Sequence, residues 1–311
     1  KRGIIFKPDA SKPWMRSHAQ VPFTVLHDDF IRVYFSTREN IDENGQFRSF
    51  SGFVDLDRKD PQKIIKVSDT PILGLGGLGE FDELGSMAGS VVRHEGMFYL
   101  YYCGWQRLVT TPYNWAIGLA VSNDGEKFKK IGPGPLLGPT FNEPYLQACP
   151  IVYKLDDDNW HMFYLSGTKW MDIDGKKESQ YLLMHATSTD GINWDRNGKS
   201  IIDTVVEDEC QTSASIIKKD GNYHMFLSYR FGTSFRADKG RGYRIGYAWS
   251  KDLITWNRDD TLAGIDVSAE GWDSEMIAYP HVVDVDGKTL MFYCGNYFGI
   301  EGFGYAVLEE R

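Results

Sequence analysis

Acidic residues recur at one place in a pattern that this sequence repeats. Seven residues before an apolar strand pattern begins, four of its five copies carry Glu83, Glu143, Asp208 or Asp273. Two carboxylates across a pocket can cleave an acetal, because one protonates the leaving oxygen and the other activates water or attacks. The alternative is that these acids cap turns or pair with Arg and Lys. The first reading predicts these catalytic candidates: Glu143, Asp208, Glu209, Asp273 and Glu275.

Basic and aromatic residues form a second set, in the segments that follow the second strand of each copy. These segments read "STREN", "CGWQR", "SGTKW", "SYRFG" and "CGNYFG". Guanidinium groups and aromatic rings beside carboxylates suit a polyhydroxylated ligand, including an anionic one. An imidazole that titrates near neutral pH adds a further candidate, whose structural alternative is a hydrogen-bonded channel residue. The predicted binding residues are His18, Arg38, Glu83, Trp105, Lys169, Trp170, Arg230, Asn296 and Tyr297.

Five hairpin patterns position these residues. Each has an apolar strand, a tight turn of Gly, Asp or Asn, and a second apolar strand rich in aromatic residues. The strand starts fall at positions 22, 90, 150, 215 and 280, which gives steps of 68, 60, 65 and 65 residues. Such even spacing indicates an internal structural repeat.

A third strand follows each hairpin, as in "WAIGLAVS" and "YRIGYAWS". In three copies a turn then leads to a fourth strand: "SNDGEKF", "STDGINW" and "SKDLITW". We expect the turn Asp to accept backbone N–H groups and the aromatic residue to pack against a neighbouring sheet. Four antiparallel strands per repeat predict an all-β fold, a five-bladed β-propeller spanning residues 1–311 as one domain, with a strand near Gly3–Phe6 completing the last blade.

Composition limits the classes of partner. The net charge of −9 and the lack of long basic runs argue against nucleic acid. The sequence contains no run of about 18 apolar residues, so no membrane span is predicted, and the opening residues lack a signal-peptide pattern. The four cysteines have no CxxC spacing, which favours free thiols and a cytoplasmic location. No linear motif for a cofactor or metal is found, and the sequence leaves the oligomeric state open.

The blade phrases "GLAVSNDGEKFKKIG", "MHATSTDGINWDRNG" and "GYAWSKDLITWNRDD", with "CPIVYKLDDDNWHMFYLSG", carry a resemblance over nearly the whole chain. The sequence resembles the five-bladed propeller glycosidase superfamily, which includes arabinanases, β-xylosidases, invertases, levansucrases and the family 130 mannoside phosphorylases. In arabinanase-like members the catalytic acids lie one or two residues before the first strand of a blade. Here those positions carry no carboxylate: Gln20/Val21, Ala88/Gly89, Ala148/Cys149, Ser213/Ala214 and Ala278/Tyr279.

The resemblance implies a glycoside hydrolase whose acids have moved outward. Glu209 or Glu143 would be the general acid, and Asp273 or Glu275 the base or nucleophile; "ECQTSAS" at Glu209 is similar to the Glu-Cys of invertase-like enzymes. A phosphorylase is the second hypothesis, with arginines holding inorganic phosphate and one acid sufficing. A glycan-binding propeller without catalysis is the third.

Overall fold

Nearly all of the regular structure in this computed structural model is β-strand, and the structure describes residues 1–173 and 175–309. The hairpins predicted from the sequence are confirmed as antiparallel pairs, each followed by an antiparallel third strand. Among the described residues, no helix is long and apolar enough to cross a membrane.

Three sheets have four strands each, in antiparallel order. One contains β10 (Gln147–Asp156), β11 (Asn159–Ile173), β12 (Lys176–Ser188) and β13 (Asp195–Ser200). The next contains β14 (Cys210–Lys219), β15 (Asn222–Arg230), β16 (Arg244–Ser250) and β17 (Asn257–Arg258). In the third, the N-terminal β1 (Ile4–Phe6) pairs with β20 (Phe303–Val307), beside β19 (Lys288–Cys294) and β18 (Ala278–Val285). The predicted completion of the last sheet by the N-terminal strand is therefore confirmed.

The remaining sheet joins two antiparallel sets of strands through one parallel pair, Ser49 with Gly85. The first set is β2 (Ser17–Leu26), β3 (Phe30–Ile41), β4 (Phe47–Asp57) and β5 (Ile64–Val67). The second is β6 (Gly85–His94), β7 (Met97–Gln106), β8 (Asn114–Ser122) and β9 (Lys129–Lys130). Short helices occur at η1 (Lys239–Arg241), η2 (Asp260–Leu262) and α1 (Asn296–Gly299).

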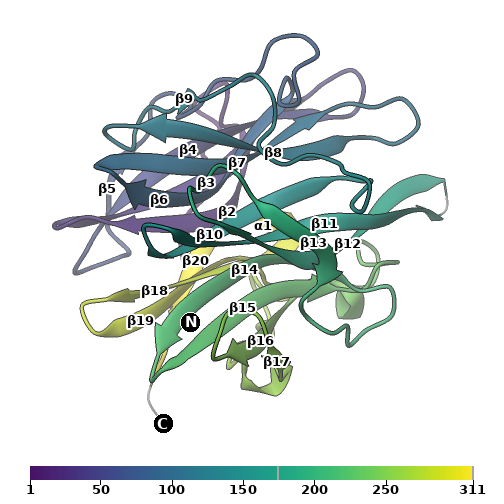
Figure 1. The fold of residues 1–311 in the computed structure, drawn as a ribbon. Coiled ribbons are helices and arrows are strands. Elements are labelled where there is room, and N and C mark those ends of the chain that lie inside the picture. The colour runs from purple at the N-terminus through teal and green to yellow at the C-terminus, as the bar shows by residue number, and fades with distance from the viewer. Residues whose placement is uncertain (174, 310–311) are drawn as a thin grey trace.

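The first strands of successive sets contact one another in the order β2, β6, β10, β14, β18, and β18 contacts β2. Figure 1 shows the purple N-terminal strand β2 on the same side of the molecule as the yellow β18 and β20. Five segments that start about 65 residues apart in the sequence thus meet around one centre, and the ends of the chain lie in the same sheet.

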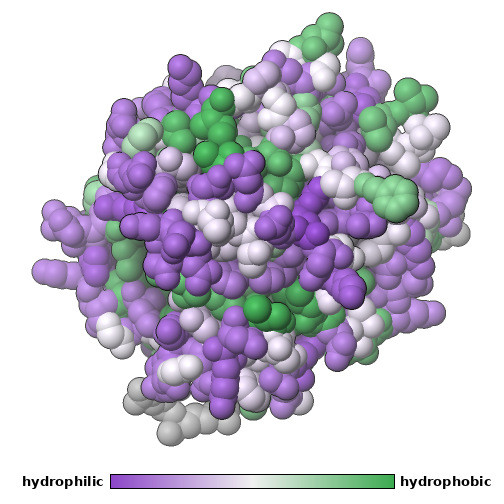
Figure 2. All heavy atoms as spheres, in the orientation of Figure 1, coloured by the Kyte–Doolittle hydropathy of each residue, from purple (hydrophilic) through white to green (hydrophobic). Residues whose placement is uncertain are grey.

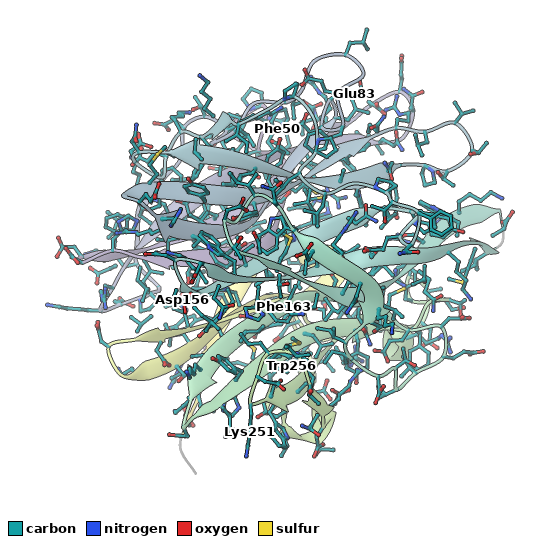
Figure 3. All side chains as sticks on the ribbon, viewed as in Figure 1. Phe50, Glu83, Asp156, Phe163, Lys251 and Trp256 are labelled. Atoms are coloured by element: carbon teal, nitrogen blue, oxygen red, sulfur yellow. The ribbon has the colours of Figure 1, made fainter. Side chains whose placement is uncertain are left out.

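The repeated turns join neighbouring sets of strands. In the turn after β12, the Asp190 carboxylate accepts the backbone N–H groups of Ile192 and Asn193. The aromatic residue that follows packs edge-on against the preceding sheet, with centroid distances of 6.0 Å for Trp194–Tyr101 and 5.9 Å for Trp256–Phe163. Figure 3 shows the latter pair close together. The predicted roles of the turn Asp and of the aromatic residue are confirmed.

Candidate functional site

The first strand of every set is irregular near its start. The pairing register shifts in each of these strands, after Gln20, Ala88, Ala148, Thr212 and Ala278. In four of them a non-glycine residue adopts a positive φ: Val21 (51°), Cys149 (50°), Ser213 (52°) and Tyr279 (57°). A bulge of this kind re-aims the adjoining side chains, and the strain is tolerated only where the surroundings hold it in place.

A cavity of about 620 Å³ lies over these irregular strand starts. Val21, Ala88, Cys149, Thr212 and Tyr279 line it, so all five first strands contribute. Its volume falls within the range of small-molecule sites, roughly 300–1,000 Å³. Aromatic side chains supply much of the wall: Phe47, Trp105, Tyr113, Trp115, Tyr181, Phe235, Tyr243, Tyr279 and Phe298. The face of the molecule drawn in Figure 2 is mostly hydrophilic, with hydrophobic side chains in separate patches.

The charged lining of the cavity is mainly basic. It consists of Arg38, Lys176, Lys177, Arg230, Arg236 and a single carboxylate among the described lining residues, Glu178. Glu178 belongs to β12, and its Oε1 lies 3.0 Å from Arg236 Nε. Lys177 pairs with Asp172. Arg38 and Arg230 form no ion pair with a carboxylate in the part of the chain that the structure describes.

Arg230, the last residue of β15, is 4% exposed. Its Nη1 donates to the carbonyl oxygen of Phe231 at 2.8 Å and its Nη2 to the Tyr181 hydroxyl at 3.1 Å. The guanidinium carbon lies 3.5 Å from the ring centroid of Phe235, which is a close cation–π contact. The group is thus fixed by rings and neutral acceptors.

Arg38 lies in β3 and lines the same cavity. Its Nε donates to Gln20 Oε1 at 3.2 Å, and its guanidinium lies 5.2 Å from the ring centroid of Phe47. Burial and the positive charge of Arg236 lower the pKa of the Arg38 guanidinium.

The predicted catalytic acids lie outside the cavity lining, each beside a cation. Glu209 Oε1 is 2.6 Å from Arg258 Nη1, and its other oxygen accepts the N–H groups of Val205 and Val206. Lysines lie within 2.8 Å of three more of these acids, in the pairs Lys169–Asp208, Lys1–Asp273 and Lys239–Glu275. The acids therefore pair with Arg and Lys, which was the alternative interpretation of the sequence. Their catalytic role stays a prediction.

Three of the sets share one arrangement, in which a buried acid accepts a hydrogen bond from a tyrosine of the second strand and faces a cation. Tyr164 donates to Glu143 at 3.0 Å, with Arg196 at 3.7 Å. The same arrangement occurs in Asp82–Tyr102–Lys130 and in Asp273–Tyr293–Lys1. The hydrogen bonds and cation account for the burial of these carboxylates, since an unpaired buried charge is costly.

Of the predicted binding residues, Arg38, Trp105 and Arg230 line the cavity. The others do not. Burial lowers the pKa of His18 to about 3, with a contribution from Arg38, so this imidazole is neutral near neutral pH. Asn296 Oδ1 accepts the backbone N–H groups of Glu275 and Met276. Figure 3 places Glu83 on the outer loop before β6. The remaining three outside the lining are Lys169, Trp170 and Tyr297.

Several lining residues were not among the predicted site residues. Glu178 of β12 meets Arg236 of the segment between β15 and β16, 58 positions away in the sequence. Ser36, Thr212 and Tyr181 fall inside or beside ordinary strand patterns. Only their position in the repeat could have indicated Ser36 and Thr212 as site residues. Ser36 ends a second strand pattern, and Thr212 lies just before a first one. No cluster of three or more His, Cys, Asp or Glu that could hold a metal occurs among the described residues.

Solved structures share this fold at low sequence identity. A glycoside hydrolase superposes with a TM-score of 0.74 at 18% identity, covering 99% of this chain and 91% of that one. A protein from work on the family 130 mannoside phosphorylases, which contain glycoside hydrolases that target β-1,2-mannosidic linkages in Candida mannan, gives 0.68 at 14%, with the same coverage. The resemblance to propeller glycosidases inferred from the sequence is confirmed at the level of the fold.

Sequence relatives extend the comparison. A 1,2-β-oligomannan phosphorylase of Thermoanaerobacter sp. (strain X514) is 32% identical over 139 residues, which is 42% of this chain and 44% of that protein. No family model matches the chain. The uncharacterised protein Rv1502 of Mycobacterium tuberculosis (strain ATCC 25618 / H37Rv) is 36% identical over 312 aligned residues, 100% of this chain and 99% of its own length. The chain therefore belongs to the same family as this mycobacterial protein.

Proposed function

We propose that this protein is an enzyme that cleaves a glycosidic bond in a glycan or oligosaccharide bound in the central cavity. The observation that carries the proposal is the cavity itself, which lies over the strand starts from all five sets and combines aromatic faces, fixed arginines and one carboxylate. Aromatic faces and a few convergent polar groups are typical of small-molecule sites. The shared fold raises the expectation of carbohydrate chemistry without naming the reaction.

The architecture in this proposal is a five-bladed propeller. Each of the five strand sets would be one blade, with the sets β2–β5 and β6–β9 as separate blades bridged by the Ser49–Gly85 pair. The closed order of contacts among the first strands supports this interpretation. The cavity would then lie on the propeller axis, where ligand sites are expected because loops from every blade meet there.

Glu178 is the residue to which we assign the proton-handling role. It is the lining carboxylate, beside Arg236, and as the general acid it would give its proton to the leaving glycosidic oxygen. Hydrolysis by the usual two-carboxylate mechanisms needs a second acid. Transfer to inorganic phosphate needs no second carboxylate as base, so the partial likeness to an oligomannan phosphorylase makes phosphate dependence a central question.

The test is release of reducing sugar or aryl alcohol from a panel of aryl glycosides and oligosaccharides, with and without phosphate. We expect Glu178→Gln to lower kcat by about a hundredfold or more, as loss of a general acid–base group does. Glu301→Gln is the matched control, because Glu301 pairs with Lys7 outside the lining. Full activity of Glu178→Gln together with loss in folded Glu143→Gln or Glu209→Gln would return the role to the buried acids.

A second candidate function is glycan binding without cleavage. It is favoured by one observation, that the positions at the strand starts carry no carboxylate: Gln20, Val21, Ala88, Ala148, Cys149, Thr212 and Tyr279 line the cavity. Binding of an oligosaccharide with no turnover on the panel, unchanged in Glu178→Gln, would select this function over the enzyme.

A further inference from the structure

We propose that the saccharide recognised in this cavity carries an oxyanion of its own, a carboxylate or a phosphate ester, and that Arg38 and Arg230 hold it. The inference rests on the proposed function, because it names the substrate class of the same site. It follows from the hydrogen bonding and charge of these two arginines, from the hydroxyl groups near them, and from the size of the cavity.

Arg230 has hydrogen-bonding capacity that the protein leaves unused. Its side chain is buried, yet Nε has no hydrogen-bond partner and the two bonds it does form go to neutral oxygens. No carboxylate of the described residues lies within ion-pair distance of it. A buried guanidinium without a counter-charge is costly, so its retention on a cavity wall is explained if a ligand supplies the negative charge.

Arg38, which is half-buried, lines the same cavity and also lacks a counter-charge among the described residues. Its one side-chain hydrogen bond goes to the neutral amide oxygen of Gln20. The lining carboxylate Glu178 pairs with Arg236, and the lining Lys177 pairs with Asp172. After these pairs cancel, Arg38, Arg230 and Lys176 leave the described lining with uncompensated positive charge. Guanidinium forks bind carboxylates and phosphates with two parallel hydrogen bonds.

Two hydroxyl groups add neutral donors to the same lining. Ser36 Oγ and Thr212 Oγ1 are buried and have no hydrogen-bond partner among the described atoms, although Ser36 belongs to β3 and Thr212 to β14. Buried polar groups are normally satisfied, so two more unpaired ones beside the arginines point to a polar ligand. Four unsatisfied or partly satisfied groups from three strands, β3, β14 and β15, thus face one cavity.

The size and the apolar walls of the cavity indicate that the anion belongs to a larger molecule. Tyr113 and Trp115 stack with ring centroids 4.5 Å apart, and both line the cavity with Trp105. Flat rings of this kind offer the apolar surface on which sugar rings pack, whereas a free tetrahedral ion would leave most of the 620 Å³ unfilled.

The experiment is isothermal titration calorimetry of the full chain with hexuronates and hexose phosphates, each paired with its neutral hexose, and with inorganic phosphate. We expect at least one charged sugar to bind about tenfold or more tightly than its neutral partner, as charge-assisted hydrogen bonds predict. The two charged series distinguish a carboxylate from a phosphate ester. Arg38→Gln should abolish this preference and Arg38→Lys should retain part of it.

Arg93→Gln is the matched control, because Arg93 lies on β6 away from the lining and donates to His27. Arg230→Gln should also abolish the preference for charged sugars. If this variant fails to fold, the Arg38 variants alone test the inference. Equal affinity for charged and neutral sugars would overturn the inference, as would the absence of binding by every charged sugar at millimolar concentration. Inorganic phosphate that binds as tightly as the charged sugars and displaces them would also overturn it, since the anion would then be the free ion.

The outcomes separate this inference from the proposed function. Cleavage of neutral glycosides that depends on Glu178, without any preference for charge, would leave the enzyme in place and remove the oxyanion site. Tight binding of a charged sugar that depends on Arg38, without cleavage of any charged substrate, would retain the oxyanion site and reject the enzyme.

Discussion

At the scale of single residues, the deciding quantity is whether a buried charge has a partner. The acids that the spacing selected are buried or half-buried against cations, and their hydrogen bonds are largely satisfied within the protein. The arginines on the cavity wall are the opposite case. Spacing in a sequence shows that a residue recurs, whereas only its partners show whether it has capacity left for a ligand.

Arg258 provides a direct test of the structural role of the acids. Its Nη1 lies 2.6 Å from Glu209, whose side chain is 0% exposed, so Arg258→Ala leaves a buried carboxylate without its cation. We expect the free energy of unfolding to fall by about 3–5 kcal/mol, measured by urea denaturation. Lys63→Ala, which removes an exposed pair with Asp57, should cost under about 1 kcal/mol. Similar stability for the two variants would contradict this.

At the scale of elements, one turn recurs after β8, β12 and β16 and holds neighbouring sets of strands together. In each turn a Ser hydroxyl and an Asp carboxylate bond to each other and accept backbone N–H groups. The following aromatic side chain then reaches the preceding set of strands. The first strands of the sets are less uniform than these turns. Their bulges differ in register and residue type, while all of them turn side chains into the cavity.

The turn Asp190 makes stability depend on pH in a predictable direction. Hydrogen bonds from the backbone of Asn193, and from Ile192, lower its pKa from 3.8 to about 2. Because the folded pKa is depressed, the stabilisation is present above about pH 4 and is lost as the pH falls towards 2. We expect Asp190→Ala to cost about 1 kcal/mol at pH 7 and progressively less below pH 4, measured by urea denaturation.

Asp190→Asn is the matched control for this turn. The amide oxygen of Asn can accept the same backbone N–H groups, so this variant should keep most of the stability at pH 7. The part of the stability that the side chain contributes should then not titrate. A stability difference between wild type and Asp190→Ala that stays constant from pH 7 to pH 2.5 would refute the assignment.

At the scale of the whole molecule, both ends of the chain close one sheet. β1 pairs with β20, Ile5 and Phe6 are buried, and Phe6 lies 5.0 Å from Phe35 of β3 between ring centroids. The Lys1 ammonium lies 2.8 Å from the buried carboxylate of Asp273. The short N-terminal segment thus joins the first and last strand sets of the molecule. Its contribution to the free energy of unfolding is therefore larger than its length suggests.

Removal of residues 1–6 tests this closure. Loss of two buried apolar side chains at about 1.5–3 kcal/mol each should lower the free energy of unfolding by roughly 3–6 kcal/mol, before any cost at Asp273. Thermal and urea unfolding would measure it, with Ile4→Ala as the control for a side chain that is 36% exposed. An unchanged unfolding midpoint in the truncated chain would show that the last sheet does not depend on β1.

The sequence by itself determined the repeated units of this protein. Alternation of apolar residues and turn residues are local properties, so the hairpins and the Asp turns could be predicted from them. The pairing of the N-terminal strand followed from the repeat, because the last copy has no fourth strand of its own. Arg38, Trp105 and Arg230 were also found, because the ends of the second strands, which extend further than the sequence patterns suggested, reach the cavity. Only the tertiary structure decided which charges neutralise one another. Glu209 meets Arg258 and Glu178 meets Arg236 across 49 and 58 positions, and such pairings depend on packing between segments that no local pattern encodes.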